Sequence, residues 1–454
     1  MLFNTYEFLL GFLPAALLIY WFADRSERWR TWVLIGLSLA FYSYWDLRFL
    51  PIMIGSILLN WSAAKLYAAT RRNGVIAAAI AANLLALGFF KYTNFIAENC
   101  LALFGVTSAR FDIVLPLGIS FFTFHHIMYL VDLRGGRAPV YRLDKYALYT
   151  CFFPQAISGP IARWSEVIHQ FGKTAFGPGW QQRCALGSAF IVIGLLQKVL
   201  IADPLAAALD PIYADALVGP VTDGRSWMAL GFAFQIFLDF AAYSDIAIGL
   251  GLVFGVELPL NFDGPLRAVS ITELWRRWHM TLSRFLRDYV YVPLGGSRHG
   301  MPQQVAALLI TMALCGLWHG AGWNFVLWGF LQGVALVAAL AWRKFCPPLP
   351  SVVGWALTIG FFVGTMVIFR AGSLAAVWHV YEGLTVSPAA HLAGRNTLLA
   401  AMVWAIVLPP SHKMCRWLTE TPRFSVAVGL AAALSLILVV IGRRESYQFI
   451  YFQF

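Results

Sequence analysis

The sequence predicts an all-α protein that crosses a membrane many times. Apolar residues make up 60% of the 454 positions, and charged residues make up only 12%, whereas soluble globular proteins carry about 25% charged residues. Apolar runs near the length that spans a bilayer, about 20 residues, recur along the whole chain. Because so few charged side chains are available to cover a water-exposed surface, we expect the outer surface to face lipid.

Ten apolar runs are candidates for membrane helices. They lie near residues 6–23, 32–48, 51–69, 75–96, 113–131, 185–203, 227–255, 352–370, 398–410 and 424–442, with shorter stretches at 146–158 and 304–342. The first run has neither basic residues before it nor a small-residue cleavage pattern after it, so we expect it to remain in the membrane. No linker or internal repeat divides the chain, which predicts a single polytopic domain over residues 1–454.

Orientation follows from the bias of Lys and Arg toward cytoplasmic loops. With the N-terminus outside, the basic residues of 25–30, 71–72 and 134–145 all fall inside. The arginine-rich segment 256–303 also falls inside, and the aspartate-rich segment 204–226 falls outside. The C-terminus is then expected outside the cytoplasm.

Two features complicate this alternation. Arg443 and Arg444 fall outside together with the C-terminus. The alternation also requires the stretch 304–342 to be a hairpin with two short arms that enters and leaves the membrane from the cytoplasmic side.

The charge and cysteine content exclude other classes. Lys and Arg exceed Asp and Glu by 33 to 22, a net charge of +11. In a soluble protein this excess would suggest nucleic acid, but here most basic residues lie in short loops beside the membrane, so lipid is the expected partner. The six cysteines form no CxxC motif and no close group with histidines, so we predict neither a disulfide framework nor a metal site.

Residues 270–290 (SITELWRRWHMTLSRFLRDYV) carry the clearest amphipathic pattern. Ser270 and Glu273 fit a capping box at the start of a helix. Apolar side chains then recur at helical spacing, namely Ile271, Leu274, Trp275, Trp278, Leu282, Phe285, Leu286 and Tyr289. The flanks carry four arginines, namely Arg276, Arg277, Arg284 and Arg287. We expect one continuous helix in the cytoplasmic interface, whose arginines bind either anionic lipid head groups or the phosphates of a substrate.

Aromatic and histidine residues of this helix have structural alternatives. Trp275 and Trp278 are expected to be interfacial anchors. His279 lies at the edge of the apolar stripe, where a single histidine is more often structural than catalytic.

Residues 315–333 (CGLWHGAGWNFVLWGFLQG) place an imidazole at membrane depth. Gly316, Gly320 and Gly322 surround His319, which predicts a break in the helix or a close backbone approach. Ionisable residues inside a membrane are costly and usually functional, so His319 is the best candidate for chemistry. A buried neutral imidazole can accept a proton from a hydroxyl group.

A general base acting on a hydroxyl beside a thioester or ester gives acyl transfer. Phosphoryl transfer fits less well, because the sequence has no GxxxxGK[ST] loop and no carboxylate set for Mg²⁺. A serine hydrolase is disfavoured because no G-x-S-x-G motif is present.

Four strings of the sequence resemble the membrane-bound O-acyltransferases, in particular the bacterial branch that O-acetylates alginate, peptidoglycan and cellulose. They are LPLGISFFTFHHIMYLVD (115–132), FFPQAISGPIARWSE (152–166), NFDGPLRAVSITELWRRWHMTLSRFLRDYVYVPLGGSRHG (261–300) and LWHGAGWNFVLWG (317–329). The resemblance implies a ring of about 10–13 transmembrane or re-entrant helices around a thin central region, with funnels opening to both sides.

The same resemblance implies roles for residues and partners. His319 falls on the principal catalytic histidine of the family, and His279 falls on its upstream polar partner. The implied reaction takes an acetyl group from cytoplasmic acetyl-CoA, which is a substrate and not a bound cofactor. An extracytoplasmic acetyltransferase of the SGNH type, working with polysaccharide export or synthesis machinery, would then modify the polymer. The implied location is the bacterial cytoplasmic (inner) membrane.

The last residues, FIYFQF (449–454), have two interpretations. From composition they are an aromatic cluster at the membrane interface. From the resemblance, related acyl-transfer systems carry a similar terminal motif, and Tyr451 would then accept the acyl group as His319 removes its phenolic proton.

Two other functions suit the same features. Many helices, glycine breaks and buried histidines also fit a transporter or flippase, although no repeated halves are detectable. An acyltransferase that acts on a protein or a lipid is the second alternative.

Overall fold

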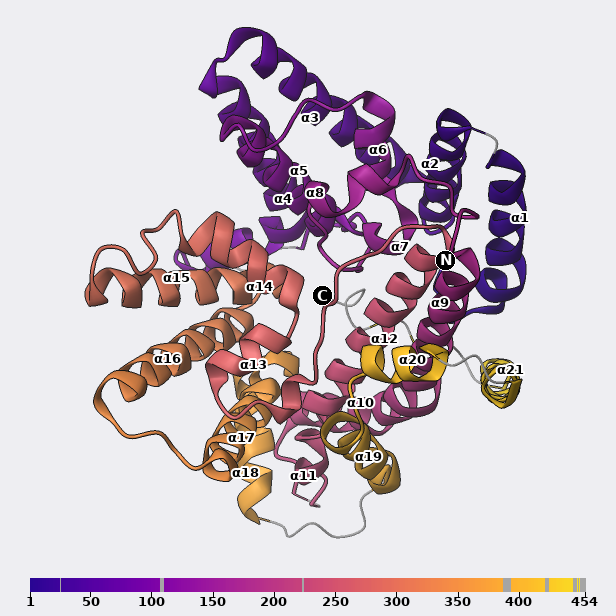
Figure 1. The fold of residues 1–454 in the computed structure, drawn as a ribbon. Coiled ribbons are helices and arrows are strands. Elements are labelled where there is room, and N and C mark those ends of the chain that lie inside the picture. The colour runs from indigo at the N-terminus through magenta and orange to yellow at the C-terminus, as the bar shows by residue number, and fades with distance from the viewer. Residues whose placement is uncertain are drawn as a thin grey trace. The chain divides into compact units, whose positions relative to one another are not determined.

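A computed structural model describes residues 1–24, 26–106, 110–222, 224–386, 393–420, 424–443, 447 and 449. Within these residues the secondary structure is helical and includes no strand, which confirms the all-α class. The chain divides into two compact units, with boundaries within helix α9, within helix α12 and after Pro259. Figure 1 labels both helices. Arg444 and Tyr451 lie outside the described residues.

The first unit comprises Met1–Ile191 and Ile246–Pro259. Its helices are η1 (Glu7–Phe12), α1 (Leu13–Ala23), α2 (Glu27–Ser43), η2 (Leu47–Phe49), α3 (Leu50–Thr70), α4 (Asn73–Ala102), α5 (Ile119–Arg134), α6 (Leu143–Cys151), α7 (Phe153–Ala156), α8 (Trp164–Val167), η3 (Ile168–Gln170) and most of α9 (Trp180–Leu195).

Buried polar pairs hold the helices of the first unit together. Asn60 of α3 and Asn83 of α4 exchange side-chain amide hydrogen bonds of 3.1 and 2.7 Å. On α5, Nδ1 of His126 lies 2.6 Å from the hydroxyl of Tyr146 on α6, and Nε2 lies 3.3 Å from Oγ of Ser56 on α3. Polar pairs of this kind link helices where no water competes, so His126 has a structural role.

The second unit comprises Val192–Asp245 and Leu260–Phe454. Its helices are η4 (Leu196–Ala202), α10 (Asp203–Val218), α11 (Ser226–Ala229), the first part of α12 (Phe232–Val253), η5 (Pro265–Arg267), α13 (Ile271–Arg277), α14 (Met280–Leu286), η6 (Arg287–Tyr291), α15 (Met301–His319), α16 (Trp323–Phe345), α17 (Ser351–Arg370), α18 (Leu374–Val386), α19 (Arg395–Met402), η7 (Val403–Val407), α20 (Ser411–Glu420) and α21 (Phe424–Ile441).

Eight helices in the described part of the chain are long and apolar enough to cross a membrane. They cover Leu47–Thr70, Asn73–Ala102, Trp180–Val218, Ser226–Val253, Met301–His319, Trp323–Phe345, Ser351–Arg370 and Phe424–Ile441. A further pair, Arg395–Val407 and Ser411–Glu420, is bent by 72°. The chain is therefore a multi-pass membrane protein, as its composition predicts.

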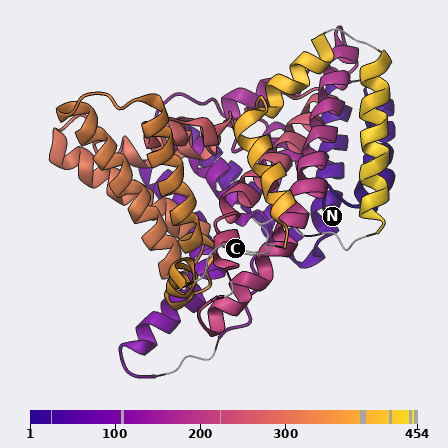
Figure 2. The same cartoon turned by 90° about the horizontal axis from the view of Figure 1, so that it is seen from below.

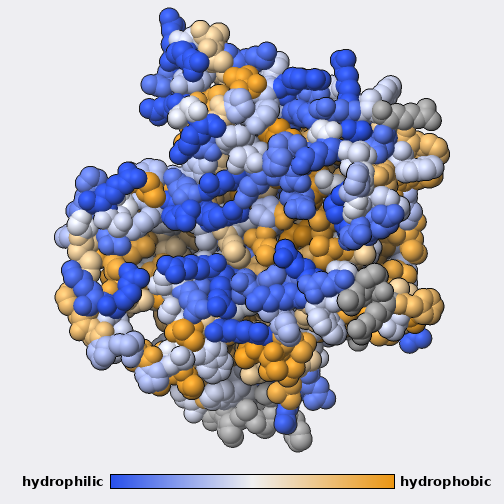
Figure 3. All heavy atoms as spheres, viewed as in Figure 1, coloured by the Kyte–Doolittle hydropathy of each residue, from blue (hydrophilic) through white to orange (hydrophobic). Residues whose placement is uncertain are grey.

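Side-chain burial separates internal helices from outer ones. In an apolar 18-residue window of the Ser226–Val253 span, 94% of the residues are buried, whereas only 6% are buried in the window of Phe424–Ile441. Figure 3 shows hydrophilic side chains across much of the viewed face, with hydrophobic side chains between them and along its margins. Exposed apolar helices such as α21 leave a surface that only lipid can cover favourably.

The helical hairpin predicted within 304–342 exists, but its arms are longer than the sequence suggested. α15 has 19 residues and α16 has 23, and the two helices lie side by side in Figures 1 and 2. Each arm satisfies the length of a full crossing. Their apolar windows, with mean hydropathies of 1.4 and 1.9, are at least as apolar as that of the predicted span Leu47–Thr70, at 1.4.

Two further segments differ from their predicted boundaries. The helix that begins at Trp180 continues to Val218, so the aspartate-rich segment 204–226 is largely the helix α10. The stretch 270–290 is not one helix, because α13 ends at Arg277 and α14 begins at Met280. The predicted cap at its start is confirmed, since Oγ of Ser270 accepts a hydrogen bond from the backbone N–H of Glu273 at 3.2 Å.

Candidate active site

His319 lies at the end of α15, where the backbone breaks before α16. Gly320 and Gly322 are both extended, with φ near −160°, so the helix stops directly after the imidazole. A Cβ on Gly316 would lie 3.0 Å from the Cα of Gly329 on α16. Glycine at both positions therefore lets the two backbones touch. The predicted helix break and the predicted close approach are both present.

Aromatic rings enclose the imidazole of His319. Its ring centroid lies 4.7 Å from that of Trp318, 5.5 Å from that of Trp328 on α16 and 5.2 Å from that of Phe369 on α17. The His319 side chain is buried. Apolar walls strengthen every electrostatic interaction made inside such a site.

Two indole N–H groups in this cluster have no hydrogen-bond acceptor within the described residues. They belong to Trp275 and Trp328, whose ring centroids lie 6.0 Å apart. A buried donor without an acceptor costs about 1–3 kcal/mol. Donors retained at this cost beside His319 are suited to binding an oxygen atom of a substrate.

The same contacts correct the expected role of two tryptophans. Trp275 is 7% exposed and Trp278 is 3% exposed, and Trp278 packs against Phe262 and Phe362. They are internal packing residues and not interfacial anchors. The apolar stripe packs against other helices of this unit. Periodicity alone cannot tell whether an apolar face is covered by protein or by lipid.

His279 forms the corner between α13 and α14. Its φ of +42° is uncommon for a residue with a Cβ, and its side chain is 0% exposed. The backbone carbonyl of Asn261 accepts the N–H of Met280 at 2.9 Å, which anchors the corner to a distant loop. A strained conformation persists only where surrounding contacts enforce it.

The Asn261 side chain fixes the tautomer of His279. Oδ1 of Asn261 accepts hydrogen bonds from the hydroxyl and the backbone N–H of Thr281, at 2.9 and 3.4 Å, while Nδ2 donates to Oγ of Ser244 at 3.1 Å. A backbone N–H can only donate, so the atom facing it is the amide oxygen. Nδ1 of His279, 3.0 Å from the same oxygen, must therefore carry the proton.

The lone pair of a neutral His279 consequently lies on Nε2. Burial lowers the pKa of His279 to about 3, because a charged imidazolium is poorly stabilised away from water. The ring is neutral near pH 7 and its Nε2 is a hydrogen-bond acceptor. Sequence periodicity could not predict this, because Asn261 lies outside the amphipathic stretch.

Trp318 brings the two predicted histidines into one cluster. Its ring centroid lies 6.2 Å from that of His279 and 4.7 Å from that of His319. Phe240 of α12 also packs against His279, with ring centroids 4.7 Å apart. The structure thus joins His279 and His319 through a shared aromatic contact, whereas Tyr451 lies outside the described residues.

The four arginines predicted to bind phosphate differ in their surroundings. Arg277 forms an ion pair of 2.5 Å with Glu273, and Arg287 forms one of 2.8 Å with Asp288. Arg276 and Arg287 are exposed, and Arg277 and Arg284 are half-buried. Arg276 therefore combines exposure with the lack of an ion pair within the described residues, whereas exposed Arg287 is already paired with Asp288.

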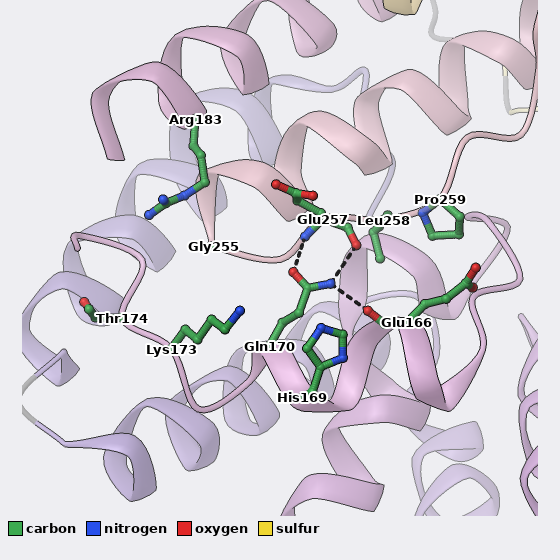
Figure 4. Close-up of a pocket in the computed structure, with 10 residues that line it drawn as sticks. All are labelled: Glu166, His169, Gln170, Lys173, Thr174, Arg183, Gly255, Glu257, Leu258 and Pro259. Atoms are coloured by element: carbon green, nitrogen blue, oxygen red, sulfur yellow. Dashed lines mark hydrogen bonds between the residues drawn. The ribbon is translucent and has the colours of Figure 1, made fainter. Parts of the chain in front are cut away.

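A separate polar pocket of about 500 Å³ lies in the first unit (Figure 4). It is lined by Glu166, His169, Gln170, Lys173, Thr174, Arg183, Gly255, Glu257, Leu258 and Pro259. Gln170 ties its walls together by accepting from the backbone N–H of Glu257 at 2.9 Å and donating to its carbonyl at 3.0 Å. It contains none of the predicted site residues and mixes acidic with basic groups.

A buried ion triad in the second unit centres on Lys198, which was not among the residues singled out in the sequence. Nζ of Lys198, on η4, lies 2.6 Å from Oδ1 of Asp239 and 2.8 Å from Oδ1 of Asp203. The next residue, Gln197, donates to Oδ2 of Asp245 at 2.8 Å. The signal was available, because Lys198 is a charge inside the predicted span 185–203.

Comparison with known proteins finds relatives that are acyltransferases. Residues 133–378, which include both histidines, match the membrane-bound O-acyltransferase family. The chain is 36% identical to the peptidoglycan O-acetyltransferase of Helicobacter pylori, over 85% of this chain and 80% of that protein. It is also 36% identical to the probable alginate O-acetylase AlgI of Pseudomonas aeruginosa, over 85% and 75%. The teichoic acid D-alanyltransferase of Streptococcus thermophilus is 28% identical over 50% of this chain.

Proposed function

The chain belongs to the membrane-bound O-acyltransferase family and is an O-acyltransferase, and from this premise we propose that it transfers acetyl groups for the O-acetylation of an exported polysaccharide or cell-wall glycan. The donor is cytoplasmic acetyl-CoA, and the protein resides in the bacterial cytoplasmic membrane. Support comes from relatives named for the O-acetylation of peptidoglycan and alginate, each 36% identical over 85% of this chain.

The observation that carries the proposal is the buried cluster around Trp318. In this cluster His319 is enclosed by aromatic rings. One of those rings, that of Trp318, also contacts His279. His319 is assigned the role of general base. His279 is assigned a positioning role, because its fixed ring packs against the tryptophan that packs against His319.

Tyr451 is proposed as the first acceptor of the acetyl group. His319 removes the phenolic proton, and the phenolate oxygen attacks the carbonyl carbon of the thioester. The carbon–sulfur bond then breaks, and the CoA thiolate recovers the proton from the imidazolium. The products are free CoA and an acetyl ester on Tyr451.

The indole N–H groups of Trp275 and Trp328 are proposed to donate to the carbonyl oxygen as negative charge develops on it. Donors placed at such an oxygen act most strongly where water is excluded. Arg276, Arg277, Arg284 and Arg287 are proposed to attract the phosphates of the donor on the cytoplasmic side.

A partner completes the reaction outside the cell membrane. An extracytoplasmic acetyltransferase of the SGNH type would take the acetyl group from the tyrosine ester and pass it to a hydroxyl group of the glycan, within a polysaccharide export or synthesis system. Return of a proton to the phenolate oxygen restores Tyr451.

The direct test compares wild-type cells with cells that carry His319→Ala. Alkali-labile acetate is measured on the extracellular polysaccharide and on purified peptidoglycan, and membrane abundance is measured by immunoblot. We expect His319→Ala to abolish acetylation at unchanged abundance. Full acetylation by this variant would remove His319 from the mechanism. Unchanged acetylation on deletion of the whole gene would refute the proposed function.

A further inference from the structure

Phe449, near the end of the chain, is docked inside the second unit. Its side chain is 1% exposed. Nζ of Lys198 lies over its ring, 4.3 Å from the centroid, and the ring of Tyr243 meets it edge-on at 4.9 Å and 89°. An interfacial aromatic belt residue would instead lie at the lipid boundary.

The Lys198 ammonium group that contacts Phe449 is also held by two carboxylates. Lys198 is 1% exposed, and its ammonium group contacts the carboxylates of Asp239 and Asp203. Burying such a charge at membrane depth is costly. The two carboxylates fix the ammonium position, and the face of an aromatic ring attracts a desolvated cation.

α12 connects this docked ring to the site of the histidines. Asp239 and Tyr243 are four residues apart, so they share one face of the helix, and they hold Lys198 and Phe449. Phe240 and Ser244 are also four residues apart and share the adjoining face. Phe240 packs against the His279 ring, and Ser244 accepts from Asn261, which fixes that ring.

We propose that Lys198, Asp239 and Tyr243 form a docking site for Phe449 that tethers the C-terminal segment to α12 through this one ring. Two peptide units separate Phe449 from Tyr451, so their Cα atoms are at most about 7 Å apart. A tether at Phe449 therefore limits how far the acceptor hydroxyl can lie from α12, whose adjoining face contacts His279. This inference rests on the proposed relay role of Tyr451.

The test measures tail release and acetylation separately. A thiol introduced by Gln453→Cys is labelled with a membrane-impermeant maleimide in intact protein, and the parent protein without this change gives the background of the native cysteines. Phe449 is replaced by alanine or by 3,4,5-trifluorophenylalanine, which keeps the ring shape but weakens its attraction for a cation. Glycan acetylation and membrane abundance are measured in parallel.

We expect Phe449→Ala to raise the labelling rate about tenfold or more, because a desolvated cation–π contact and the burial of the ring are both lost. The trifluorinated ring should give an intermediate rate. Acetylation should fall in the same order at unchanged abundance. An unchanged labelling rate for Phe449→Ala would overturn the docking site, and wild-type behaviour of the trifluorinated ring would overturn the role of Lys198.

A matched variant separates this inference from the relay role. Tyr451→Phe should abolish acetylation while leaving the labelling rate as in wild type. If Tyr451→Phe retains acetylation, the relay role is wrong and the docking inference loses the function it was assigned. If acetylation is lost in Tyr451→Phe but Phe449 variants label and acetylate normally, the relay stands and the docking site is wrong.

Discussion

His279 donates its Nδ1–H to Oδ1 of Asn261 across 3.0 Å, and this contact decides which nitrogen of the imidazole can accept a proton. Asn261 cannot rotate its amide without losing the bonds from Thr281 and to Ser244. The loop at 261 therefore acts on a histidine 18 positions away in the sequence.

Asn261→Ala should lower the acetylation rate about 10- to 100-fold, the loss seen when a residue that orients a metal-binding imidazole is removed. Ser244→Ala is the matched control. It removes the acceptor of the amide N–H but keeps the amide oxygen, so its effect should be much smaller. Equal losses in both variants would indicate general unfolding, which a thermal melt of the purified protein would reveal.

Trp328→Phe should lower kcat about 10²- to 10³-fold, because it removes one donor to the developing oxyanion and keeps most of the aromatic packing. The measurement is the single-turnover rate with labelled acetyl-CoA in membranes. Trp378→Phe, at a position on α18 that is 68% exposed, is the control and should be silent. A wild-type rate for Trp328→Phe would exclude its N–H from the mechanism.

Arg276→Gln should raise the KM for acetyl-CoA several-fold and leave kcat unchanged, because the role proposed for this exposed guanidinium is to attract the phosphates of the donor, away from the reacting atoms. The difference from wild type should shrink as salt rises from about 0.05 to 0.5 M. Arg343→Gln, in the last turn of α16, is the control. A fall in kcat with constant KM would contradict the assigned role.

Gly329→Ala should destabilise the protein by about 1–3 kcal/mol through overpacking. The added methyl group would overlap the backbone oxygen of Met312 and approach the Cα of Gly316 to 2.9 Å. Gly364→Ala on α17 is the control, since nothing lies within 4 Å of its Cβ position. The midpoint of thermal unfolding in detergent should fall only for Gly329→Ala. An unchanged midpoint would show that α15 and α16 can separate without cost.

The local sequence was sufficient where the determining interaction is local. Hydropathy located most of the membrane helices, and the glycines around His319 predicted the end of α15. Both signals come from neighbouring residues, because helix length and backbone freedom depend on side chains only a few positions apart.

The stretch 270–290 shows where local pattern failed. Its apolar side chains keep the helical period through His279, so periodicity predicts one helix facing lipid. The backbone of Asn261 instead takes the N–H of Met280, and Trp278 is buried against Phe262 and Phe362. A bend caused by a hydrogen-bond acceptor far away in the sequence does not change the spacing of the apolar residues.

By itself, the sequence determined that this protein is helical, that it lies in a membrane and that His319 is its best candidate base. Only the tertiary structure decided that Asn261 selects the tautomer of His279, that Trp318 joins the two histidines and that Lys198 lies under Phe449. The physical reason is that the free energy of transfer into lipid is a sum over neighbouring residues of the chain. The proton position on an imidazole and the pairing of a buried charge depend on atoms that folding brings within 3 to 5 Å from remote positions.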